Sequence, residues 1–76
     1  MSYLYGVIID GVHPRQLVTV SDSAGRAGDL AAHLRKAIPD GAEFVTVEHV
    51  DSFYPPEFTD ADSAWLAAAD AFRRGA

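Results

Sequence analysis

An uninterrupted apolar segment, Tyr3–Ile9 (YLYGVII), places the strongest constraint on how this chain can fold. Its β-branched and aromatic residues are typical of a β-strand. In a strand, Leu4 and Ile8 lie on one face, whereas Tyr3, Tyr5, Val7 and Ile9 lie on the other. A strand that is apolar on both faces belongs in the centre of a sheet or under cover on both sides. The rest of the chain must therefore supply its neighbours and its cover.

The chain is short for that task, because it has only 76 residues. One domain of this size buries about 60–65% of its extended-chain surface, so a monomer is expected to be marginally stable. The sequence is 49% hydrophobic and 22% charged, which indicates a globular rather than a disordered chain. It contains no cysteine, so no disulfide can stabilise the core.

Four further elements are predicted from the remaining sequence. Turn residues in Asp10–Arg15 lead to a returning strand, Gln16–Val20, which gives a hairpin. A helix follows and ends before Pro39; its candidate N-caps are Ser21, Asp22 and Ser23, and its apolar face is Ala27, Leu30, Ala31, Leu34 and Ile38.

The second half of the chain begins with a strand, Glu43–Val50, expected at a sheet edge, and continues as the loop Asp51–Phe58. Thr59 and Asp62 resemble a capping box and predict the start of a last helix. This helix presents an apolar face of Ala61, Trp65, Ala68 and Phe72 and ends near Gly75.

The predicted element order is therefore β-β-α-β-α, in one α+β domain. A right-handed crossover makes the second and third strands parallel to each other, so both are antiparallel to the first strand between them. We expect a three-stranded antiparallel sheet of order 2-1-3 with both helices on one face.

This arrangement leaves one sheet face without helices. If Leu4 and Ile8 face the helices, an outward apolar patch remains, formed by Tyr3, Tyr5, Val7 and Phe44. Large exposed apolar patches usually mark interfaces, and self-association would supply the burial that a small domain lacks. The sequence therefore predicts a homodimer through this sheet face or its edge. The alternative is that its tyrosines form a solvated face.

A second candidate surface is the loop, which concentrates aromatic side chains around two prolines. Rigid aromatic residues resemble the hot spots of protein interfaces. The residues expected to contact a partner are Phe53, Tyr54, Pro55, Pro56 and Glu57. In an alternative that the sequence leaves open, Phe53 and Phe58 turn inward and close the core.

Several classes of function are disfavoured. A net charge of −5 opposes binding to nucleic acids and to anionic membranes. The three histidines lack metal-ligand spacing, and no nucleophile or nucleotide-binding motif is present. We expect no metal, no cofactor and no enzymatic activity. No signal peptide is recognisable, so a cytoplasmic location is expected.

The sequence thus favours a small non-enzymatic protein that binds another protein, as a regulator or inhibitor. The partner is expected to present a basic patch to this acidic chain. Frequent Ala and Asp, with Arg far outnumbering Lys, indicate a high-GC source such as an actinobacterium or its phage. The alternative function is a small-ligand-binding or catalytic domain that uses a groove between the 51–58 loop and the first helix.

Overall fold

A computed structural model describes residues 3–11 and 14–75 of the chain. Val12 and His13, in the predicted turn, lie outside the described residues. The elements, in chain order, are β1 (Leu4–Ile9), β2 (Gln16–Ser21), α1 (Ala24–Ala37), the 3-10 helix η1 (Pro39–Phe44), β3 (Val45–Val50), β4 (Thr59–Asp60) and α2 (Ser63–Arg73).

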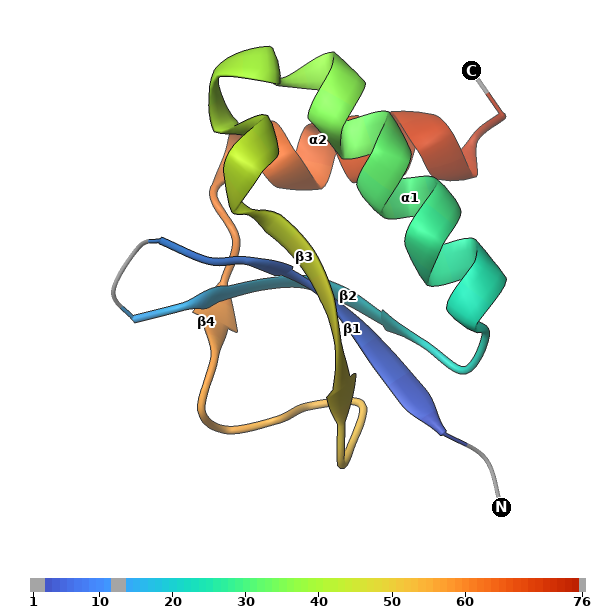
Figure 1. The fold of residues 1–76 in the computed structure, drawn as a ribbon, viewed down its shortest axis with the longest axis vertical. Coiled ribbons are helices and arrows are strands. Elements are labelled where there is room, and N and C mark those ends of the chain that lie inside the picture. Colours follow the sequence, from blue (N-terminus) through green and yellow to red (C-terminus); the bar gives the residue numbers. More distant parts are fainter. Residues whose placement is uncertain (1–2, 12–13, 76) are drawn as a thin grey trace.

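The strands form one sheet of order β3-β1-β2-β4 (Figure 1). The mixed α+β class is confirmed, and β1 lies between β2 and β3 with antiparallel pairing to both. The prediction of three antiparallel strands is wrong, because a fourth strand, β4, pairs in parallel with β2.

The extra strand replaces the helix start that was expected at Thr59. The amide of Thr59 donates a hydrogen bond to the carbonyl of Arg15, and the amide of Ala61 donates to the carbonyl of Leu17, each at 3.1 Å. These sheet bonds keep the residues that follow Thr59 in the strand rather than in a helical turn, so no helix begins at Thr59. Helix α2 begins only at Ser63, with Asp62 as its N-cap.

Both helices lie on the same side of the sheet, above it in Figure 1. Ser23 caps α1 by accepting a hydrogen bond from the amide of Arg26, as one of the three candidate caps predicted. The side chains that fill the core between sheet and helices are Val7, Ile9, Val18, Ala27, Leu30, Ala31, Leu34, Val45, Ala61, Trp65 and Ala69.

The two faces of β1 were separated correctly from the sequence, but they were assigned to the wrong sides. Val7 is fully buried in the core beneath the helices, and Tyr5 packs against that core. Neither therefore forms the outward patch expected for a homodimer, whereas Tyr3 and Phe44 are exposed. Self-association stays a prediction, with Tyr3 and Phe44 as the exposed residues of the expected set.

The opposite face of the sheet also buries apolar side chains. Around Gly6, a Cβ atom would come within 3.0–3.6 Å of the side chains of Val50, Leu17 and Ile8, so these side chains share this second face. The 51–58 segment runs from β3 to β4 on this side, below the sheet in Figure 1. The fold therefore has three layers, and the loop is the third.

The chain between α1 and β3 differs from the prediction in one further respect. Pro39–Phe44 forms η1, so β3 starts at Val45 rather than at Glu43. Strand β3 lies at the edge of the sheet, as the sequence suggested. Among the described residues, no helix is long and apolar enough to cross a membrane.

Candidate functional site

The 51–58 loop is held to the underside of the sheet at its second half. Pro55 is buried, and the amide of Phe58 donates a hydrogen bond to the carbonyl of Pro55 at 3.4 Å. The guanidinium carbon of Arg15 lies 5.2 Å from the centre of the Phe58 ring, within the range of a cation–π contact. The loop is therefore anchored, although it contains no regular secondary structure.

The first half of the loop presents its aromatic residues to solvent. The exposed fractions of Phe53 and Tyr54 are 54% and 91%, and Pro56 and Glu57 are also exposed. Phe53 therefore does not turn into the core, whereas Phe58 is half-buried. Pro55 was expected to contact a partner, but its burial makes it an anchor of the loop instead.

Arg15 connects this loop to two strands, although no sequence pattern singles it out. Its side chain forms ion pairs with Asp10 at the end of β1 and with Glu48 on β3. Its carbonyl also accepts the hydrogen bond from the amide of Thr59. Glu48, Phe58 and Thr59 are distant from Arg15 in sequence, so only the folded chain shows the connection.

Replacing Arg15 with alanine should lower the free energy of unfolding by about 1 kcal/mol, because partly exposed ion pairs and a cation–π contact contribute modestly. The larger effect should be faster chymotrypsin cleavage after Phe58, whose ring loses its contact with Arg15 in the variant. Urea unfolding and timed proteolysis measure both. Arg74→Ala, which removes only an ion pair with Asp70 on α2, is the control. Equal cleavage rates in the two variants would contradict the anchoring role.

Next to this loop, β2 has a partly free edge. Its pairing with β4 covers only Gln16 and Leu17, which face Thr59 and Asp60. Within the described part of the chain, no strand pairs with the outer edge of β2 from Val18 to Ser21. Such an edge presents backbone donors and acceptors that another chain can use.

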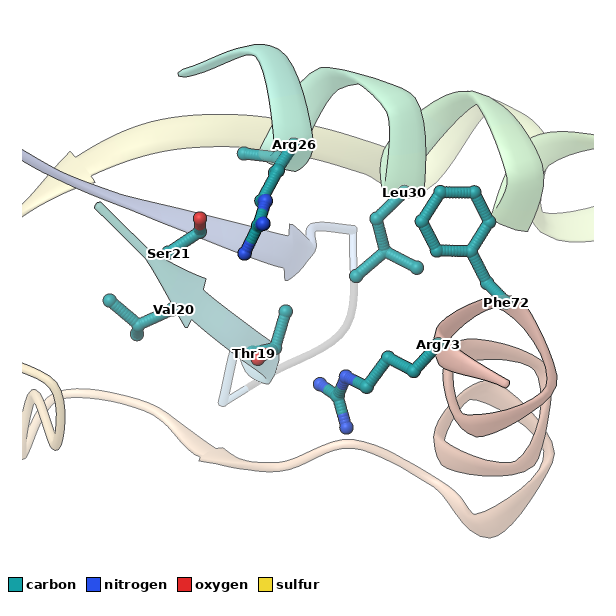
Figure 2. Close-up of a pocket in the computed structure, with 8 residues that line it drawn as sticks. Thr19, Val20, Ser21, Arg26, Leu30, Phe72 and Arg73 are labelled. Atoms are coloured by element: carbon teal, nitrogen blue, oxygen red, sulfur yellow. The ribbon is translucent and has the colours of Figure 1, made fainter. Parts of the chain in front are cut away.

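A groove of about 570 Å³ opens on the helix side of this edge (Figure 2). We call it the arginine groove, because Arg26 of α1 and Arg73 of α2 both reach into it. The other side chains that line it are Thr19, Val20, Ser21, Ala27, Leu30 and Phe72. The two arginines and the hydroxyls of Thr19 and Ser21 can bind an anionic group, and the apolar side chains can pack against an apolar chain attached to it.

A smaller groove of about 290 Å³ also borders β2. We call it the aromatic groove, because Phe53 and Tyr54 form part of its wall. Its other lining residues are Leu17, Val18, Thr19, Val20 and Asp60. The two grooves share Thr19 and Val20, so they meet at the free edge of β2. The groove beside the loop thus exists, but β2 rather than the first helix forms its other wall.

The arginine groove was not predicted from the sequence, although the position of Arg26 gave one indication of it. Arg26 lies in the first turn of α1, where the helix dipole disfavours a cation, and no acidic residue accompanies it. Residues on β2, α1 and α2 come together there only through folding. Among residues 3–11 and 14–75, no group of three potential ligands could hold a metal ion.

Comparisons of this chain with protein-family models, curated proteins and solved structures find no match.

Proposed function

We propose that this chain is a protein-interaction module that binds another protein through Phe53 and Tyr54. The observation that supports the proposal most directly is the exposure of these neighbouring aromatic side chains on an anchored loop. Aromatic residues dominate the energetics of protein interfaces because they bury a large area with few rotatable bonds.

The anchoring of the loop favours binding because less conformational entropy is lost on association. Buried Pro55 and the Arg15–Phe58 contact hold the end of the loop before any partner arrives. Only the side chains of Phe53 and Tyr54, and not the whole segment, then need to be ordered in a complex.

The charges around the loop suggest the chemistry of the partner surface. Asp51, Glu57 and Asp60 are all exposed, in a chain whose net charge is −5. A partner with an apolar pocket rimmed by basic residues would complement this surface. The composition of the chain favours a high-GC bacterium as the source of such a partner, with the chain acting as a host or phage-encoded regulator.

The test compares the unmodified chain with a Phe53→Ser/Tyr54→Ser variant as immobilised baits in an actinobacterial lysate. We expect one protein to be retained stoichiometrically by the unmodified chain. With that protein purified, the double substitution should weaken binding about 100-fold or more, as expected for two hot-spot residues.

Leu66→Ser is the matched control, since it removes an exposed apolar side chain from α2, outside both grooves. Its affinity for the captured protein should equal that of the unmodified chain. Capture of no stoichiometric partner, or equal affinity of the double variant, would show that the aromatic loop is not an interaction site.

A further inference from the structure

We propose that the free edge of β2, from Val18 to Ser21, accepts an extended acidic segment of a partner protein as an added strand. This inference rests on the proposed function, because it specifies what kind of partner segment is bound and where. Three separate features of the described residues support it: the backbone edge, the alternation of side chains along it, and the charge of the arginine groove.

The backbone of this edge is free because the β2–β4 pairing ends early. Beyond Leu17 and Asp60, β4 gives way to the approach to α2. On the side away from β1, the last residues of β2 therefore have no neighbouring strand among the described residues. An extended peptide can continue the ladder along this edge and satisfy backbone groups that otherwise bond to water.

From Thr19 to Ser21 the side chains along this edge alternate between the two sides of the sheet, whereas Val18 lies in a β-bulge that shifts the register of β2 against β1. Thr19 pairs with Val7, and Ser21 pairs with Tyr5, so both lie on the helix side of the sheet. Val20 pairs with Gly6 and lies on the opposite side. An added strand would likewise alternate, with every second side chain in the arginine groove and the others on the side of the loop.

The charge of the arginine groove identifies which side chains of the added strand fit it. Among the described residues, neither Arg26 nor Arg73 has a carboxylate within salt-bridge distance, whereas Arg74 pairs with Asp70. Arg26 also lies in the first turn of α1, where a cation opposes the helix dipole. Carboxylates on the added strand would pair with both arginines and offset this repulsion.

The aromatic groove, on the other side of the edge, determines which residues of the added strand fit between its carboxylates. Phe53 and Tyr54 line the aromatic groove together with Leu17 and Val20, so apolar side chains fit there. The segment that matches both grooves therefore alternates acidic and apolar residues. The acidic net charge of the chain does not prevent this, because salt screens distant carboxylates more than contacts inside the groove.

The opposite edge of the sheet lacks these features. On β3, the carbonyl of Val45 already accepts a hydrogen bond from Nη2 of Arg35 at 2.9 Å. Neither the arginine groove nor the aromatic groove has a residue of β3 among its lining side chains. The β2 edge is thus the better of the two for a specific peptide.

The experiment is an NMR titration of the isotope-labelled full chain with a short capped peptide in which glutamate and valine alternate. Two matched peptides are titrated in parallel. One replaces every glutamate with lysine, and the other keeps the glutamates but carries N-methyl groups on alternate amides, which removes ladder donors without changing charge. The labelled chain is also titrated with inorganic phosphate.

We expect the glutamate peptide to shift the amide signals of Thr19, Val20 and Ser21 and to bind at least about tenfold more tightly than either matched peptide. Arg26→Ala and Arg73→Ala should each weaken binding about tenfold, as for loss of a charge-assisted contact. Arg74→Ala, outside the groove, should leave binding unchanged. Arg26→Ala should unfold at the same temperature as the unmodified chain or at a higher one, which separates lost binding from lost folding.

Equal binding of the N-methylated peptide would overturn strand addition, because charge alone would then explain the affinity. The proposal is also overturned if the peptide does not bind, if only phosphate shifts these signals, or if a second copy of the chain occupies the edge. If the protein captured through Phe53 and Tyr54 binds the Arg26→Ala/Arg73→Ala variant normally, this inference fails while the proposed function stands.

Discussion

Replacing Trp65 with alanine should lower the free energy of unfolding by about 4 kcal/mol. Domains have about 0.05–0.15 kcal/mol of stability per residue, which gives about 4–11 kcal/mol for 76 residues, so this single substitution removes at least about a third of the stability. Trp65 has the largest side chain in the core, so its truncation removes more buried apolar volume than alanine at any other core position.

The large effect follows from the position of the indole ring. Trp65 is 8% exposed and belongs to the core, and a Cβ atom at Gly41 would lie 2.6 Å from its Cζ2 atom. The ring therefore packs closely against the backbone of η1, and its removal leaves a cavity that cannot close without moving η1 relative to α2.

Circular dichroism during urea unfolding measures the loss, because the variant has no tryptophan for fluorescence. Leu66→Ala is the matched control, since Leu66 is the next residue on α2 and is 41% exposed. A loss in Trp65→Ala as small as in Leu66→Ala would mean that α2 does not pack on the sheet in this orientation.

Ile8→Ala should destabilise the chain by about 3 kcal/mol, which is the second largest effect expected. Ile8 is 0% exposed, although it lies on the sheet face opposite the helices, with Leu17 and Val50. Its burial therefore requires the 51–58 loop as a covering layer. Removal of three carbon atoms at a site closed on all sides costs both transfer free energy and a cavity.

Val47→Ala is the control, because Val47 is an exposed apolar residue on β3 at the sheet edge. Urea unfolding monitored by Trp65 fluorescence compares the two variants. If Ile8→Ala cost no more than Val47→Ala, the face below the sheet would be open to solvent, and the loop would not form a third layer of the fold.

The elements of the fold were largely predictable because each has its own local signal. β-Branched and other apolar residues identified β1 and β2 to within one residue at each end, and apolar spacing with Ser23 identified α1. The fourth strand had no such signal, since Thr59–Asp60 is too short for any periodicity and its partner lies on β2.

The candidate site was predicted only in part, because its two halves depend on sequence in different ways. Exposed aromatic residues in the loop were expected from Tyr54 and the two prolines, and Phe53 joins them. The arginine groove was not expected, since Arg26 and Arg73 belong to different helices. Their proximity depends on how α1 and α2 pack, for which the sequence contains no direct signal.

The sequence by itself determined that β1 lies centrally in an α+β domain, because seven consecutive apolar residues must be covered on both sides. It could not determine which face the helices cover, since both faces of the strand are apolar. Tertiary packing decided this. Val7 and Ile9 lie beneath the helices, and Ile8 lies on the side covered by the loop. Chain connectivity then placed the loop and the free edge of β2 together, and that juxtaposition forms the candidate site.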